Sequence, residues 1–280
     1  MKYHIEKNTV QETLVIPLYG RKMCSELFPQ LFRDETAIRL LDQIDYDFST
    51  LAQKSQSTVQ QFGFLEVAMR QNDLAWEVRD YLKKHPKAAV VNLGCGLDDT
   101  GRNCDNGRCK LYNLDFPDVI AVRDALLPAG EREENIPCDL NDYSWFERID
   151  ASEGAVFFAA GVFYYFLTEQ FQTLVQAMAQ AFPGGRLVFD TARKAAVKMM
   201  LKTWIRDAEI KDVGAYFSVS DARRELSSWA PDLQVSSRGY MLGYQSLDDP
   251  SVKRLYRLLA KIGDGWMKMQ IVRMEFGGQI

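Results

Sequence analysis

Short apolar runs alternate with helical patterns through the middle of the chain. The runs fall at 88–93, 110–115, a short stretch leading into 137–142, 156–161 and 186–190, and each has the length of one buried strand. Apolar residues between the runs recur at helical spacing. Strands that alternate with helices in this way predict right-handed crossovers and a doubly wound α/β sheet.

The ends of the chain follow a different pattern. Residues 1–70 show mixed, polar, short helical pieces without strand alternation and predict an N-terminal helical cap. The remaining 71–280 predict the main domain, with a helical lid insertion at about 192–230. A helix over 74–82, led by Arg70, precedes the first strand. Strand-like runs at 235–244 and 266–276 predict a closing hairpin with one antiparallel strand.

Composition narrows the class of protein. The chain has 280 residues, 47% of them hydrophobic, and a net charge of −4, so it can bury a full core but shows no electrostatic footprint for nucleic acid or anionic membrane. Its longest apolar run, 154–167, is too short to span a bilayer. Five cysteines form no paired framework or zinc spacing. We expect a soluble, cytoplasmic protein with a small-molecule substrate and no metal, nucleic acid or membrane partner.

A glycine turn follows the first strand, at Gly94-Cys95-Gly96. A dinucleotide fingerprint requires a third glycine three positions later, and Asp99 stands there instead. Asp98 and Asp99 at the mouth of the next helix would repel a pyrophosphate. The loop suits S-adenosylmethionine, whose ammonium and sulfonium are positive, and an NAD-linked oxidoreductase is a weaker alternative.

Acidic residues end the next two strands. Asp115 lies 19 residues beyond Gly96, about the spacing at which a carboxylate reaches ribose hydroxyls in nucleotide-binding βαβ units. Asp139 can accept a hydrogen bond from an adenine amino group. Both aspartates could instead be ordinary helix N-caps.

These segments resemble the leucine carboxyl methyltransferase family, and more specifically its bacterial branch of tetracenomycin-type polyketide O-methyltransferases. The resemblance lies in 90–98, 115–120 and 139–140, and extends to 14–21 and 41–47. It implies a class I methyltransferase fold, with a mostly parallel seven-stranded sheet and a terminal antiparallel hairpin. It also implies S-adenosylmethionine as donor and a helical lid as the substrate chamber.

The resemblance also implies roles for individual residues. Arg70 would hold the methionine carboxylate with help from Lys22, Asp115 would hold the ribose, and Asp139 with Leu140 the adenine. The candidate cofactor-binding residues are Lys22, Arg70, Gly94, Cys95, Gly96, Asp98, Asp115, Phe116, Asp139, Leu140 and Ala160.

The chain departs from the family pattern at two places. The family continues its Gly-Leu-Asp with Thr-Arg, where this chain has Asp99-Thr100. The family often has Glu-Gly after the fourth strand, and this chain has Ala160-Gly161. The second change removes a carboxylate near the cofactor amine, for which Asp98 or Asp99 could substitute. These departures motivate an alternative, a catalytically silent cofactor-binding or regulatory protein.

No catalytic residue stands out. Neither histidine lies near a strand end, and Tyr164 and Tyr165, the candidate substrate contacts, are more often packing residues than catalytic acids. Methyl transfer is an in-line displacement that alignment can accelerate, and an ionised carboxylate acceptor needs no base. We therefore expect a carboxylate, an acidic phenol or an enol as acceptor. A basic stripe, Lys194, Lys198, Lys202 and Arg206, is a solvated helix face or steers an anionic substrate.

Overall fold

The computed structural model describes residues 2–5, 10–200 and 216–278. Its helices are α1 (Val10–Leu27), α2 (Glu35–Gln43), α3 (Ser49–Lys54), α4 (Thr58–Lys84), α5 (Thr100–Asn103), α6 (Pro117–Leu126), η1 (Tyr143–Arg148), η2 (Phe163–Tyr165), α7 (Thr168–Ala181), α8 (Lys194–Met200), α9 (Ala222–Leu226) and α10 (Arg254–Gly265). Its strands are β1 (Tyr3–His4), β2 (Ile44–Asp45), β3 (Ala89–Leu93), β4 (Lys110–Asp115), β5 (Glu133–Pro137), β6 (Ala155–Ala159), β7 (Arg186–Thr191), β8 (Gln234–Gly239) and β9 (Gln270–Glu275).

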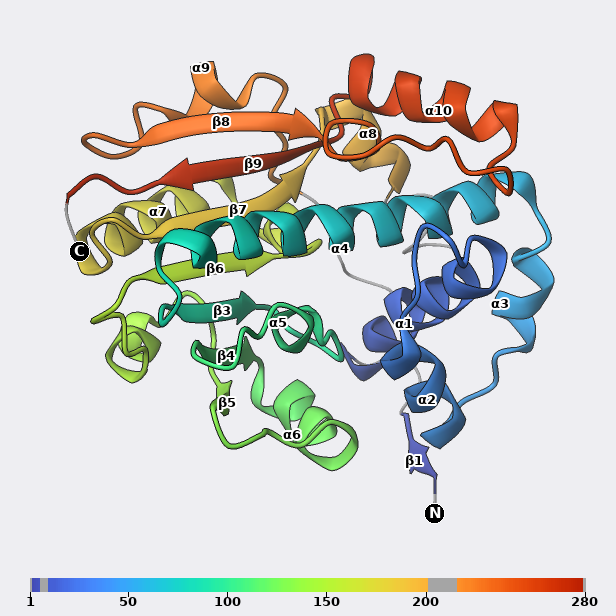
Figure 1. Cartoon of the computed structure of the whole chain (residues 1–280), viewed down its shortest axis with the longest axis horizontal. Helices are drawn as coiled ribbons and strands as arrows, with labels where there is room; N and C mark the ends of the chain where they lie inside the picture. The colour runs from blue at the N-terminus through green and yellow to red at the C-terminus, as the bar shows by residue number, and fades with distance from the viewer. Residues whose placement is uncertain (1, 6–9, 201–215, 279–280) are drawn as a thin grey trace.

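Seven strands form the central sheet in the order β5-β4-β3-β6-β7-β9-β8 (Figure 1). The first five are parallel, and β9 runs antiparallel to both of its neighbours. The order reverses between β3 and β6, which is where ligands bind in open α/β sheets. The predicted doubly wound sheet and its closing antiparallel strand are confirmed.

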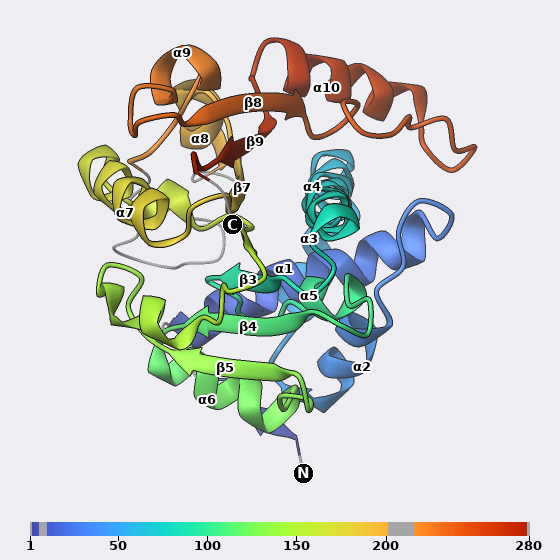
Figure 2. The same cartoon turned by 60° about the vertical axis from the view of Figure 1, so that its left-hand side comes forward.

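Two hydrophobic clusters cover the two faces of the sheet, because successive strand residues point to opposite sides. Val90 and Val156 belong to the cluster that α1, α4, α6 and α10 complete. Val91 and Phe157 belong to the cluster completed by α7, α9 and η1. Figure 2 shows α4 and α7 on opposite sides of the sheet. The sheet is therefore buried on both faces, as its continuous apolar strands predicted.

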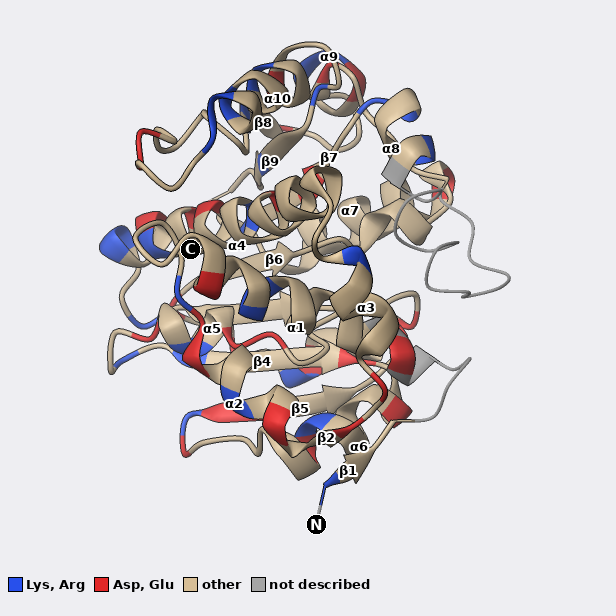
Figure 3. Ribbon diagram, turned by 90° about the vertical axis from the view of Figure 1, so that its right-hand side faces the viewer, with Lys and Arg blue, Asp and Glu red and all other residues tan. Residues whose placement is uncertain are grey.

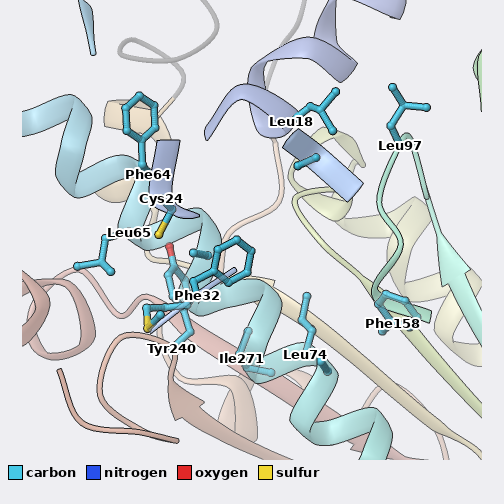
Figure 4. Packing of buried hydrophobic residues seen from close by; sticks show 14 of the residues in the cluster. Leu18, Cys24, Phe32, Phe64, Leu65, Leu74, Leu97, Phe158, Tyr240 and Ile271 are labelled. Carbon is cyan, nitrogen blue, oxygen red and sulfur yellow. The ribbon is translucent and has the colours of Figure 1, made fainter. Parts of the chain in front are cut away.

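The N-terminal helices share the core of the sheet. Cys24 lies close to Leu65 of α4 (Figure 4), and both belong, with Phe32 and Phe64, to the cluster that contains Val90 of β3. The helix α4 passes through residues 70 and 71 without interruption, so the proposed division at that point separates segments that pack together. The N-terminal part is helical as expected, apart from the two-residue parallel pair β1 and β2.

Three predicted boundaries need correction. Helix α4 begins at Thr58 and Arg70 lies in its middle, because the apolar pattern extends further back than 74–82. The pattern also predicts Thr168 as the cap of the following helix, but Thr168 is the first residue of α7, and the cap residue is Leu167, whose N–H donates to the Gln170 side chain. The third strand ends at Pro137, and the residues after it form a turn.

The predicted insertion at 192–230 contains α8 and α9. Lys194 and Lys198 lie on α8, whereas Lys202 and Arg206 of the predicted basic stripe lie outside the described residues.

Candidate active site

The glycine turn connects β3 to α5 at the carboxyl edge of the sheet. Gly94 and Gly96 have φ angles of 64° and 46°, in the left-handed region that glycine adopts without strain. Neighbouring side chains also press on the turn: a Cβ at Gly94 would lie 2.5 Å from Val162, and one at Gly96 would lie 3.1 Å from Leu14 of α1. The two glycines are required both by backbone conformation and by close packing.

Two buried arginines hold this turn in place. Arg123 of α6 is fully buried and donates to the carbonyl oxygens of Gly96 (2.9 Å) and Asp98 (2.7 Å). Arg21 of α1 donates to the Leu97 carbonyl (3.0 Å). The turn is thus fixed from both sides before any ligand binds.

Asp98 and Asp99 precede α5, as predicted, but their carboxylates face the protein. Asp98 accepts hydrogen bonds from Gln71, Asn92 and Thr100. Asp99 is buried and accepts from the Asn103 side chain, and its pKa is raised by burial and by nearby acids. Their hydrogen bonds hold the loop in shape, and their substitution for the carboxylate that the chain lacks at Ala160 stays a prediction. A direct cofactor contact by Asp98 stays a prediction.

Asp115 ends β4 directly beside the glycine turn. Its Oδ2 accepts from the Gly96 N–H and its Oδ1 from the Phe116 N–H, both at 2.8 Å. Burial raises the pKa of Asp115, and the two N–H groups counteract this. Each oxygen keeps a further lone pair for a ligand hydroxyl. Phe116 is 46% exposed at the same edge.

Asp139 lies in the turn after β5. Its Oδ1 accepts from the backbone and side-chain amides of Asn141, both at 2.9 Å, which is a local turn contact of the ordinary kind. Asp139 is exposed, and Leu140 beside it is buried. A backbone bond from Cys138 to the Asp115 carbonyl (2.8 Å) links this turn to the end of β4.

Arg70 reaches over the carboxyl ends of β6 and β7. Its Nη1 donates to Asp190 at 3.0 Å, and it lies against Gly161, where a Cβ would be 3.1 Å away. Burial by itself disfavours its charge, but Asp190, Tyr240 and Tyr164 raise the pKa of Arg70 above its ordinary value. The Nε atom of Arg70 is buried without a hydrogen-bond partner among the described residues.

Asp190 anchors this cluster from the end of β7. It is 2% exposed and also accepts from the Gly161 N–H (2.6 Å) and the Tyr164 hydroxyl (3.0 Å). Burial and Asp190 raise the pKa of Tyr164 well above its ordinary value, so Tyr164 is a hydrogen-bond donor that positions Asp190. Tyr165, next to it, is 43% exposed and is the freer of the two to touch a ligand.

Glu66 lies one helical turn before Arg70 on α4, so the two side chains share a face. Burial raises the pKa of Glu66 to about 7, and Arg70 counteracts part of this. Tyr240, a buried neighbour, interacts electrostatically with both. Within the described part of the chain, Glu66 has no hydrogen-bond or ion-pair partner. A half-buried carboxyl without a partner is a candidate ligand contact.

Two other predicted residues occupy different surroundings. Lys22 pairs with Glu26 on α1 at 2.5 Å and lines an open hollow with Tyr19 and Asp42. The structure does not bring Lys22 to the glycine turn, where its chain neighbour Arg21 lies instead. Cys95 is buried, and burial raises the pKa of its thiol. It acts as a small filler in the turn.

Sequence reasoning missed Glu66, Asp190, Tyr240, Arg21 and Arg123. The position of Asp190 at the end of a strand, like Asp115, was a usable signal. Glu66 could have been noticed from its spacing to Arg70. Nothing in the local sequence marks Tyr240 or the two arginines, because their partners are distant along the chain.

The residues at this edge fit S-adenosylmethionine. The Nε of Arg70, which has no hydrogen-bond partner among the described residues, can donate to a carboxylate. Gly94 and Gly96 are partly exposed, and Gly96 lies directly beside Asp115. Residues 2–5, 10–200 and 216–278 contain no group of acids, histidines and cysteines that could hold a metal ion, and they include no helix long and apolar enough to cross a membrane.

The sheet order and this site define the class: a class I S-adenosylmethionine-dependent methyltransferase. Solved structures with the same fold include a protein assigned as a methyltransferase from Thermobifida fusca, with TM-score 0.57, 15% identity and coverage of 92% of this chain and 94% of that one. Another is a duf574 family protein from Streptomyces avermitilis, with TM-score 0.58, 10% identity and coverage of 91% and 96%.

The model of the leucine carboxyl methyltransferase family matches residues 18–179, and the chain belongs to that family. It is also 26% identical over 242 residues to the tetracenomycin polyketide synthesis O-methyltransferase TcmP of Streptomyces glaucescens, covering 86% of each chain. The predicted family and enzyme class are confirmed.

Proposed function

We propose that the protein transfers the methyl group of S-adenosylmethionine to an oxygen atom of a small organic molecule. The main observation is the convergence of the glycine turn, Asp115 and the partly unsatisfied Arg70 guanidinium at the carboxyl edge of the sheet. The similarity to TcmP, an O-methyltransferase, supports oxygen as the acceptor atom.

Different residues of the site would bind different parts of the methyl donor. Arg70 would hold the methionine carboxylate through Nε, while Asp190 keeps the guanidinium in place. Asp115 would accept from the ribose hydroxyls, and Asp139 with Leu140 would contact the adenine. The bound sulfonium supplies an electrophilic methyl group, and the protein supplies alignment and a water-poor surrounding.

Glu66 favours a hydroxyl acceptor over a carboxylate. A carboxylate acceptor beside Glu66 would be repelled by the Glu66 carboxylate. A phenol or enol could instead donate its proton to Glu66. A base whose pKa is about 7 is well matched to this role at neutral pH. We therefore propose an acidic phenol or enol as the substrate class.

Titration calorimetry with S-adenosylhomocysteine tests the donor site. We expect saturable binding that Arg70→Met weakens at least about tenfold, since hydrogen bonds to charged groups contribute about 1.5–3 kcal/mol. No binding at millimolar ligand would contradict the proposal, and binding of NAD instead would indicate an oxidoreductase. Saturable binding with no transfer to a panel of phenols, enols and carboxylic acids would indicate a silent binding protein.

The pH profile of methyl transfer to a phenol tests Glu66. In the wild type we expect kcat to rise through about pH 7 as Glu66 ionises. Glu66→Gln should lower kcat by about a hundredfold or more and remove that titration, within the usual range for general-base catalysis. Unchanged S-adenosylhomocysteine affinity would show that the variant is folded. An unaltered pH profile would contradict the role of Glu66.

A further inference from the structure

Helix α10 has a second apolar side that faces solvent. Its inner side, formed by Tyr256, Ala260 and Gly263, is buried against the fold. The outer apolar residues recur at intervals of three and four, which places them in one row along the helix. They are Leu255 (47% exposed), Leu258 (55%), Ile262 (42%) and Trp266 (60%). A row of four large apolar side chains on one exposed helix marks an interaction surface.

Positive charge borders this row. Arg254, Lys261 and Lys268 are exposed, and none of them forms an ion pair with a residue that the structure describes. The acid of the helix, Asp264, faces inward and accepts from the N–H groups of Met241 and Leu242. Figure 3 shows the basic colouring along α10. In a chain of net charge −4, this segment is a local basic region.

The basic region continues onto α8. The Arg193 guanidinium lies 5.0 Å from the centre of the Trp266 ring and donates to the Trp266 carbonyl at 2.9 Å. Lys194 and Lys198 follow Arg193 on α8, a helix whose segment Lys194–Met200 contains no acid. The sequence had marked these two lysines as part of a basic stripe that could meet an anion.

The charges beside the row indicate which kind of partner this surface binds. If two copies paired through α10, the Arg254 and Lys261 side chains of both would be brought near one another, and like charges oppose such contact. The helix is also a ridge at the edge of the molecule (Figures 1 and 2). A ridge with leucines, isoleucine and tryptophan beside basic side chains suits the interface of a bilayer with anionic headgroups.

We propose that α10 docks the protein on an anionic lipid surface. The row Leu255–Leu258–Ile262–Trp266 would enter the boundary between headgroups and acyl chains, and the neighbouring cations would contact lipid phosphates. Contact at the surface requires no spanning helix. This proposal differs from the expectation that the chain has no membrane partner. That expectation rested on the net charge of the whole chain, which does not reveal a basic region confined to one helix.

Cosedimentation with vesicles tests this surface. We expect binding to phosphatidylglycerol-containing vesicles, little binding to pure phosphatidylcholine, and loss of binding at high salt. Leu258→Glu, and separately the pair Arg254→Glu with Lys261→Glu, should lower partitioning about tenfold or more, since each basic residue near such a surface contributes about 1 kcal/mol, or about fivefold. Unchanged thermal midpoints would show that both variants are folded.

Matched controls lie elsewhere on the surface. Val59→Glu changes a 66% exposed side chain of α4, and Lys84→Glu changes an exposed lysine at the end of that helix; both should bind like the wild type. Absence of binding to anionic vesicles, or equal loss in variants and controls, would overturn the proposal. So would a dimer in light scattering that Leu258→Glu dissociates, which would assign the row to a second copy.

Discussion

Arg123 shows how one buried side chain prepares the candidate active site. It spans from α6 to two carbonyl oxygens of the glycine turn and lies 3.5 Å from Glu133 of β5. Its charge is compensated by these partners without solvent, which is the condition under which a buried cation is tolerated. The turn therefore depends on a buried side chain from another element, α6.

Arg123→Met should destabilise the protein strongly. Two carbonyls and Glu133 would lose a buried partner, and breaking such a site costs about 3–5 kcal/mol. Urea unfolding measures this. Arg108→Met, at an exposed arginine in the loop before β4, is the matched control and should change the free energy of unfolding by less than about 0.5 kcal/mol. Equal effects of the two variants would contradict the role of Arg123.

Asp115 combines a structural and a binding role. Asp115→Ala removes acceptors for the Gly96 and Phe116 N–H groups, so the free energy of unfolding should fall by about 1–3 kcal/mol. Affinity for S-adenosylhomocysteine should fall about tenfold to a hundredfold through lost ribose contacts. Asp248→Ala, at an exposed acid before α10, should affect neither. Calorimetry that finds wild-type affinity in Asp115→Ala would exclude the ribose contact.

At the scale of elements, α4 supplies residues of the candidate active site and also buries two acidic side chains, which lowers stability. Its first half presents Glu66 and Arg70 to the site, and its second half buries Asp73 and Glu77. Glu77 forms ion pairs with Arg186 and Arg273 and accepts a hydrogen bond from the Tyr244 hydroxyl. Asp73 has an unpartnered buried oxygen among the described residues. The second half of α4 is therefore sensitive to pH.

Asp73 should make stability fall as pH rises. Burial, Asp264 and Glu77 raise the pKa of Asp73 to about 9, so between its ordinary value and about pH 9 the folded state keeps a proton that the unfolded state has lost. The free energy of unfolding should then decrease with pH, by at most about 1.4 kcal/mol per unit.

Asp73→Asn should flatten that slope, leaving stability below about pH 4 almost unchanged and raising it increasingly from there to about pH 8. Urea unfolding at several pH values measures the slope. Asp248→Asn, at an exposed acid, is the control and should keep the wild-type slope. A slope in Asp73→Asn as steep as that of the wild type would place the proton on another group.

At the scale of the whole molecule, the N-terminal helices and the sheet form one core. Residues of α1, α2, α4 and β3 belong to a single buried cluster, and Arg21 ties α1 to the glycine turn. The N-terminal helices therefore help to position the glycine turn.

We therefore expect the chain to unfold in one step. Differential scanning calorimetry should give one transition whose calorimetric and van't Hoff enthalpies agree, and a chain that begins at residue 58 should fail to fold. Two separate transitions would contradict the shared core. They would indicate that the proposed segments 1–70 and 71–280 are independent domains.

The local sequence by itself determined the strands, the glycine turn and the acid at the end of β4, because periodicity, glycine conformation and strand ends depend on neighbours along the chain. The family and enzyme class followed from the same short motifs. The resemblance also singled out Arg70, which the structure places at the carboxyl edge of the sheet in contact with Asp190 of β7.

Only the tertiary structure decided what surrounds those motifs. It showed that Asp98 shapes the loop and that Arg21 rather than Lys22 touches the turn. It also showed that Glu66 lies beside Arg70 without a partner among the described residues. The tertiary structure further showed that the outer apolar row of α10 faces solvent, although the helical spacing of these residues would by itself predict a buried side. The reason is physical: burial, pairing and pKa depend on distant segments brought together by packing, and a helical pattern does not say which apolar side meets the core.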